Sequence, residues 1–254
     1  MPEASPIPEI YDVTLADIRA SLRAGWADFW AAPLFGIFFS AVYVIGGWIM
    51  YLIYAKAGQT WWGIPVIVGF PLIAPFAAVG LYEVSRQMEL GEKPGWGSVL
   101  GVVFAERNRQ VPWIGTLIMF LFMFWVFVAH AIFALVMGLS AMSNVPDILE
   151  LFTTQQGLIL LALEMGLGSA FAFLVYIITT ISLPLLLDRE LDFVTAMIIS
   201  VKTVMQSFPT MLIWAFIIAT LLFWAMVLGL LGLLIVMPVL GHATWHLYRR
   251  ALSK

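Results

Sequence analysis

Long stretches without a formal charge are the feature that most constrains this chain. No Asp, Glu, Lys or Arg occurs between Lys202 and Arg249, nor between Arg109 and Asp147. A helix needs about 20 mostly apolar residues to cross about 30 Å of hydrocarbon, and both stretches exceed that length. Of all residues, 63% are hydrophobic and only 11% are charged, against about 25% charged in soluble domains. The sequence therefore predicts an all-α polytopic membrane protein.

Six transmembrane helices account for the apolar runs, at residues 34–54, 63–81, 111–137, 157–187, 210–227 and 228–247. The last two runs are contiguous, which predicts a tight hairpin near Leu228 and Gly229. In this arrangement eleven of the twelve Lys and Arg residues fall on one side of the membrane, and Lys56 falls alone on the other. Because basic loops stay in the cytoplasm, we expect both termini there. The chain is then a multi-pass protein of the inner (plasma) membrane.

Three amphipathic stretches precede the hairpins, and each is closed by a proline at position 33, 112 or 209. Their apolar residues recur every three or four positions, which predicts interfacial helices at residues 14–31, 96–108 and 191–208. Their stripes are Leu15, Ile18, Leu22, Trp26 and Phe29; Trp96, Val99, Leu100, Val103 and Phe104; and Phe193, Met197, Val201, Val204 and Phe208.

The recurrence of these stretches predicts a threefold internal repeat of interfacial helix plus hairpin. The repeat units are about 14–82, 96–187 and 191–248, within a single membrane domain 1–254 that begins with a flexible tail at residues 1–13. The alternative is that prolines and amphipathic stretches gather at membrane interfaces without any repeat.

His130 and Glu164 are polar residues inside apolar runs. Each lies about 20 residues from the cytoplasmic end of its span, so antiparallel packing would place both near the outer interface. The pattern predicts a polar membrane pair, because ionisable groups in spans are often functional. The alternative is that the two side chains reach water separately.

His242 and His246 are four residues apart and therefore share one helix face. They form a candidate ligand pair for a metal or haem. A metal site needs at least a third ligand, and the chain has no cysteine, so we predict neither a metal nor another cofactor. The alternative is an aromatic belt at the membrane interface, formed by these residues with Trp245 and Tyr248.

Prolines mark two spans as candidates for kinks. Pro71 and Pro75 stand in the second run and Pro184 in the fourth, where they would line the cavity of a channel or transporter, since broken helices often line such sites. No charged residue accompanies them at the membrane midplane, which weakens that interpretation.

Four segments of the chain resemble a family of bacterial predicted integral membrane proteins that is known only as a domain of unknown function. They are LRAGWADFWAAPLFGIFF, GQTWWGIPVIVGFPLIAPFAAVGLYEVSRQMELGE, LPLLLDRELDFVTAMIISV and MPVLGHATWHLYRRAL. The resemblance covers nearly the whole chain and implies a bacterial inner-membrane protein. It implies no activity, substrate or catalytic residue.

The sequence carries no phosphate-binding glycine loop and no nucleophile elbow, so we predict no enzyme. A net charge of −3 gives no basic field for nucleic acid. The leading hypothesis is a non-catalytic scaffold or assembly/accessory factor for membrane proteins or lipids, with the bilayer and a membrane protein as its partners. The alternatives are a channel or transporter of a small neutral or hydrophobic solute, and an intramembrane enzyme, haem or metal protein that uses the histidines.

Overall fold

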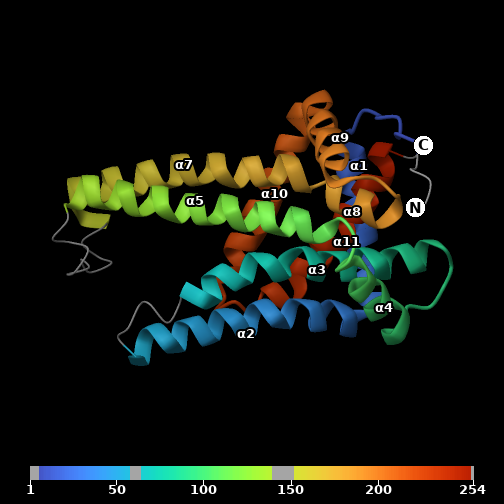
Figure 1. Cartoon of the computed structure of the whole chain (residues 1–254), viewed down its shortest axis with the longest axis horizontal. Helices are drawn as coiled ribbons and strands as arrows, with labels where there is room; N and C mark the ends of the chain where they lie inside the picture. The colour runs from blue at the N-terminus through green and yellow to red at the C-terminus, as the bar shows by residue number, and fades with distance from the viewer. Residues whose placement is uncertain (1–5, 58–63, 139–151, 253–254) are drawn as a thin grey trace. The chain divides into compact units, whose positions relative to one another are not determined.

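The computed structural model describes residues 6–57, 64–138 and 152–252, and for residues 50, 53–57 and 64–76 it describes the backbone alone. All regular structure in these ranges is helical (Figure 1), which confirms the expected all-α class. The helices are α1 (Leu15–Ala31), α2 (Pro33–Ala57), α3 (Ile64–Glu89), α4 (Trp96–Glu106), α5 (Val111–Met137), α7 (Gln155–Thr179), α8 (Ser182–Asp188), α9 (Phe193–Gln206), α10 (Phe208–Val227) and α11 (Leu233–Leu252).

Three helical segments of the described chain are long and apolar enough to cross a membrane: Val111–Met137, Gln155–Asp188 and Phe208–Val227. They reproduce the runs expected at 111–137, 157–187 and 210–227. A fourth span is present if Leu15–Ala31 and Pro33–Ile49 count as one bent span. The runs expected at 34–54 and 63–81 lie partly on residues whose side chains are not described, so six spans with cytoplasmic termini stay a prediction.

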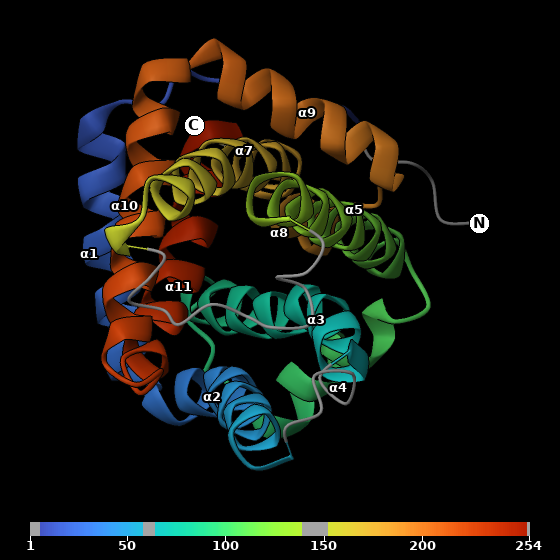
Figure 2. The same cartoon turned by 90° about the vertical axis from the view of Figure 1, so that its left-hand side faces the viewer.

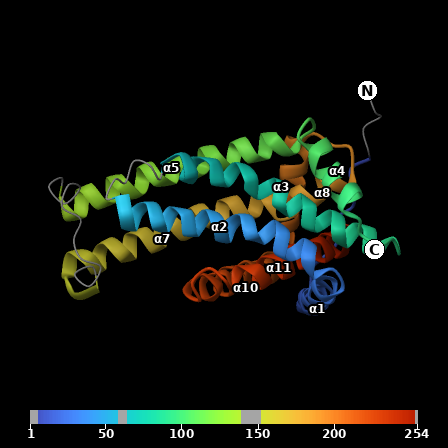
Figure 3. The same cartoon turned by 90° about the horizontal axis from the view of Figure 1, so that it is seen from below.

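Helices α1, α4 and α9 occupy the three stretches expected to be interfacial, and each ends just before the next long helix begins. Local capping explains where two of them start. Thr14 and Asp17 form a capping box at α1, and Asp192 accepts a hydrogen bond from the Thr195 backbone N–H at α9. The axis of α1 is bent by 99° from that of α2, so Figure 3 looks nearly along α1 while α2 runs across the view. The helices are confirmed, whereas their threefold repeat and their place in the membrane stay predictions.

The apolar stripe expected on α1 is only partly packed. Ile18 and Phe29 are buried, but Leu15 and Trp26 are about half exposed, at 48% and 50%. Ser21 and Gly25 occupy the buried face instead. Small residues face the packed side because α1 lies very close to α11, as described below.

The chain divides into two compact units, and each is described by itself. The single membrane domain and its repeat units stay predictions. The smaller, Leu117–Tyr176, contains the later part of α5 and most of α7, which lie side by side (Figure 1). Aromatic rings join the two helices: the Trp125 and Phe171 centroids are 5.5 Å apart, and the Trp125 ring also lies over Gly168. The contact of large rings with glycine lets the helices interdigitate there.

The larger unit comprises the remaining residues and has an apolar core between α2, α3 and α4. That cluster contains Phe35, Phe39, Tyr43, Ala77, Leu81, Val84 and Val99. In Figure 2, which looks roughly along α2 and α3, α1 and α9 run across the view. Helices α10 and α11 form the expected tight hairpin, in which Gly229 and Leu230 both have positive φ, +68° and +67°. Glycine adopts that conformation without a steric penalty.

Residues 6–13 precede α1 and include backbone groups with defined partners, whereas residues 1–5 of the expected flexible tail lie outside the described residues. The Tyr11 N–H donates to the Ala251 carbonyl at 2.8 Å, and the Val13 N–H donates to Ser207 Oγ at 2.8 Å. Both partners lie more than 190 positions away in sequence. The segment before α1 is thereby attached to the ends of α9 and α11.

Candidate functional site

The backbones of α1 and α11 approach each other closely at Gly25. A Cβ atom added to Gly25 would lie 2.5 Å from the Ala243 backbone N and 2.6 Å from the Val239 carbonyl oxygen. Only glycine allows the two backbones to approach this closely. The approach brings the polar side chains that follow Gly25 on α1 against those of α11.

Four polar side chains meet at this contact, and we call them the Asp28 cluster: Asp28, Ser85, His242 and His246. They come from α1, α3 and α11. Asp28 Oδ2 accepts two hydrogen bonds, from Ser85 Oγ at 2.7 Å and from His246 Nε2 at 2.8 Å. Ser85 Oγ is also 2.8 Å from His242 Nδ1. One carboxylate therefore connects three helices that are far apart in sequence.

The proton positions in the cluster follow from counting donors. The single hydroxyl proton of Ser85 points to Asp28, so His242 Nδ1 must carry a proton and donate to Ser85 Oγ. His242 is fully buried, and its Nε2 has no hydrogen-bond partner among the described residues. The contact with Ser85 therefore fixes the orientation of the His242 ring within the cluster.

The carboxylate of Asp28 is stabilised in its charged form. Burial by itself would raise the Asp28 pKa, but the hydrogen bonds from His246 and Ser85 and the nearby imidazoles hold that pKa below its ordinary value. The side chain is only 15% exposed. Asp28 is therefore an ionised group largely shielded from water, with hydrogen bonds in place of hydration.

A second group of polar contacts involves Trp245, Tyr248 and Arg249, towards the C-terminal end of α11. Tyr248 Oη donates to Asp188 Oδ2 at 2.6 Å, and Trp245 Nε1 donates to Glu89 Oε2 at 3.0 Å. Arg249 forms ion pairs with both acids. Trp245 and Tyr248 are both fully buried. The interpretation of these residues as an aromatic belt is wrong, because their polar atoms find partners inside the protein rather than at a lipid interface.

A third group connects α4 to the segment before α9. Arg109 forms ion pairs with Glu106 and with Glu190, the latter at 2.5 Å. Glu106 is 1% exposed, and burial raises its pKa in spite of the neighbouring guanidinium. Like the Asp28 cluster, this group ties helix ends together with a buried acid.

The two histidines predicted as a ligand pair do lie in one cluster, together with Asp28. Within the described ranges, however, no group of three or more His, Cys, Asp or Glu side chains has a geometry suited to a metal ion. Each histidine instead has a hydrogen-bond partner in the protein, Ser85 or Asp28. Whether the pair ever binds a ligand stays a prediction.

His130 and Glu164 both lie in the smaller unit. His130 Nδ1 donates to the Val126 carbonyl at 2.7 Å within its own helix, and its ring is exposed. Glu164 is half-buried and interacts electrostatically with His130. No hydrogen bond or ion pair joins the two side chains, both of which the structure describes. The polar membrane pair stays a prediction.

The three prolines expected to kink spans are placed differently. Pro71 and Pro75 lie in α3, but their side chains are outside the described residues. Pro184 is buried in the first turn of α8, just after the break that separates α7 from α8. Ser200 bridges this break, since its Oγ accepts from Ile181 N–H at 3.2 Å and donates to the Ile177 carbonyl at 2.7 Å. A cavity lined by these prolines stays a prediction.

Sequence reasoning missed Asp28 and Ser85, the two residues that connect the histidines. A signal for Asp28 was present: Ser21, Gly25 and Asp28 share one face of α1, and a stripe of small residues indicates close helix packing. No comparable signal identifies Ser85, because its role depends on which helix lies opposite.

Comparisons with known proteins agree with the membrane architecture. Residues 63–188, just under half of the chain, match the family model described as a predicted integral membrane protein (DUF2189). The resemblance to predicted integral membrane proteins of unknown function is thereby confirmed over that range. No curated protein and no solved structure matched the chain.

Proposed function

We propose that this protein is a non-catalytic scaffold or accessory factor for membrane proteins or lipids. The observation that carries the proposal is that the polar side chains of the Asp28 cluster contact one another inside the protein. Its groups hold α1 against α3 and α11 and have no opening to solvent at Ser85 or His242, which are both fully buried. The cluster stabilises an arrangement of helices.

An enzyme would use similar residues differently. A serine nucleophile needs access to a substrate and a base that takes its proton. Here the Ser85 hydroxyl donates to the Asp28 carboxylate, and the serine has no exposed surface. Both facts disfavour nucleophilic catalysis and favour a structural role.

The smaller unit offers a surface that fits a partner helix. Phe120, Phe124 and Phe127 recur at helical spacing on α5 and are 64%, 51% and 69% exposed. An apolar stripe of this kind packs against lipid tails or against a helix of another membrane protein. A scaffold would use such a stripe to hold its partner.

We further propose that the chain resides in a bacterial inner membrane, with six spans and with both termini in the cytoplasm. The distribution of eleven of the twelve basic residues to one side supports this orientation. The three acid-centred groups described above lie near the ends of helices on that same side of the six-span arrangement.

The alternative function is a channel or transporter of a small neutral or hydrophobic solute. One observation favours it: Trp48, Tyr51, Gly229 and Leu230 line a largely apolar pocket of about 280 Å³. That volume suits only a small molecule. A conducting pathway would also need a passage from this pocket to the opposite side of the membrane.

Purification of the full chain from its native membrane in a gentle detergent tests the proposal. We expect a membrane protein to co-purify in a fixed ratio and to be lost when Phe120 and Phe124 are replaced by leucine. The matched control replaces Phe216 and Phe223, exposed aromatics of α10, in the same way. Uptake of a small solute by vesicles that contain the purified chain alone, with no co-purifying protein, would favour the transporter instead.

A further inference from the structure

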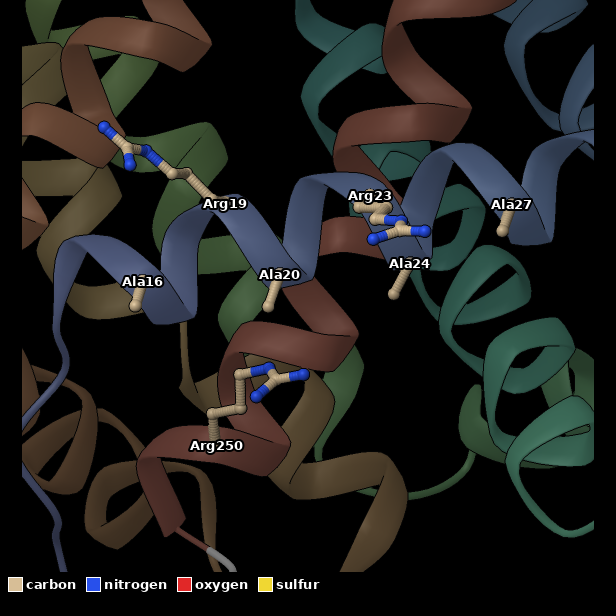
Figure 4. Close-up of a pocket in the computed structure, with 7 residues that line it drawn as sticks. All are labelled: Ala16, Arg19, Ala20, Arg23, Ala24, Ala27 and Arg250. Atoms are coloured by element: carbon tan, nitrogen blue, oxygen red, sulfur yellow. The ribbon is translucent and has the colours of Figure 1, made fainter.

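A basic groove lies on α1, away from the Asp28 cluster. Its walls carry Arg19 and Arg23 from α1 and Arg250 from α11, and its volume is about 630 Å³. The row between them consists of alanines alone: Ala16, Ala20, Ala24 and Ala27. Figure 4 shows Arg19 and Arg23 on one side of this row and Arg250 rising from α11 on the other.

The groove has an excess of positive charge. The only ion pair among its three arginines joins Arg250 to Asp17 at 3.7 Å, among the residues that the structure describes. Asp17 is also engaged by the backbone N–H and hydroxyl of Thr14. Arg19 and Arg23 stand one helical turn apart on the exposed face. In Figure 4 the Arg19 side chain points away from Arg23, and rotation of this flexible side chain would bring both guanidinium groups to one anion. Guanidinium is the side chain best suited to bind phosphate oxygens in pairs.

The position of α1 indicates that the anion belongs to a phospholipid headgroup. Because α1 is bent by 99° from α2, it lies close to the membrane plane if α2 crosses the bilayer. Trp26 and Trp30 follow the arginines along the same exposed face, at 50% and 59% exposure, with their rings 5.8 Å apart. Tryptophan prefers the depth of the lipid headgroups. Arginine and tryptophan on one face of an in-plane helix place the groove at the level of phospholipid phosphates.

We propose that this groove binds the headgroup of an acidic phospholipid, whose phosphodiester lies between Arg19, Arg23 and Arg250 over the alanine row. A zwitterionic lipid carries a cation next to its phosphate, which the arginines repel, so the groove selects lipids with net negative charge. This inference rests on the proposed function for its biological purpose, since it names the lipid partner of the scaffold. It also gives Trp26 and Trp30 a role as anchors beside the bound headgroup.

Native mass spectrometry of the detergent-purified full chain tests the groove. The chain is titrated with phosphatidylglycerol, with phosphatidylcholine and with inorganic phosphate. We expect one phosphatidylglycerol to bind at least tenfold more tightly than phosphatidylcholine, and its affinity to fall as salt rises. The double variant Arg19→Gln/Arg23→Gln should lose about tenfold in affinity. The matched control, Arg107→Gln/Lys202→Gln, removes the same charge at exposed sites and should retain the affinity.

Three results would overturn the proposal. Equal binding of the two lipids would show that the groove does not select for net negative charge. An equal loss of affinity in the control variant would reduce the effect to general charge attraction. Competition by inorganic phosphate at the same concentration as phosphatidylglycerol would make the groove a site for free phosphate. If the double variant does not fold, the single variants are each expected to lose about threefold. Lipid binding without any co-purifying protein would leave the groove intact and refute only the scaffold for membrane proteins, so the two proposals fail separately.

Discussion

Replacing Gly25 by alanine is expected to force α1 away from α11. The new methyl carbon would lie 2.5–2.9 Å from Ala243 N, Val239 O and Ala243 Cα, well short of the 3.4 Å at which ordinary contact begins. All three atoms belong to the backbone of α11, so no side-chain rotation can relieve the overlap. The helices must therefore separate.

The size of the effect follows from two opposing contributions. Overpacking of a tight contact costs about 1–3 kcal/mol, and backbone neighbours place this case at the upper end. Alanine in a helix interior is favoured over glycine by about 1 kcal/mol. The net loss for Gly25→Ala is then about 2 kcal/mol in the free energy of unfolding. Separation of α1 from α11 would also lengthen the hydrogen bond from His246 to Asp28.

A matched substitution in α4 provides the control. A Cβ atom at Gly101 would meet nothing within 4 Å, so Gly101→Ala should stabilise the protein by about 0.5–1 kcal/mol through helix propensity alone. Unfolding in mixed micelles, followed by tryptophan fluorescence, measures both variants against the wild-type chain. If Gly25→Ala proves as stable as Gly101→Ala, the close approach of α1 and α11 is refuted.

Three further predictions concern the Asp28 cluster and the topology. Asp28→Ala removes the acceptor of two hydrogen bonds and should lower the free energy of unfolding by about 2–4 kcal/mol. The control Glu92→Ala, at an exposed acid, should change the free energy of unfolding by less than about 0.5 kcal/mol. Equal effects of the two substitutions would mean that the cluster has no structural role. Because the folded-state pKa of Asp28 lies below its ordinary value, its contribution is present above the unfolded-state pKa of about 3.9 and is lost as pH falls through the folded-state pKa. The stability difference between wild type and Asp28→Asn should accordingly shrink below about pH 4, and a constant difference from pH 3 to pH 7 would contradict the assignment. Reporter fusions placed before Leu34 and after Lys254 should report the cytoplasm and a fusion at Asn144 the opposite side, so a cytoplasmic signal at Asn144 would contradict the six-span arrangement.

The helices themselves were predictable from the sequence. The uncharged run at 111–137 coincides with α5, and the contiguous runs after residue 210 predicted the α10–α11 hairpin at Leu228 and Gly229. The three amphipathic stretches became α1, α4 and α9 with bounds that differ by only a few residues. These features follow from hydropathy, proline and capping residues, which act over one helix at a time. A local pattern is sufficient to determine a local structure.

The faces of the helices were predicted less well. On α1 the predicted apolar stripe includes Trp26, which is half exposed, whereas Gly25, outside that stripe, lies against α11. Hydrophobicity identifies residues that avoid water, but in a membrane protein lipid satisfies them as well as a packed core does. Close approach of two backbones depends instead on small residues, which carry little hydrophobic signal.

The Asp28 cluster was decided by tertiary structure alone. The spacing of His242 and His246 showed that they share a helix face, and this much the sequence determined by itself. Their partners Ser85 and Asp28 lie 157 and 218 positions away, on helices whose neighbours no local pattern specifies. A hydrogen bond depends on positions to within a few tenths of an ångström, and those positions exist only after α1, α3 and α11 have packed together.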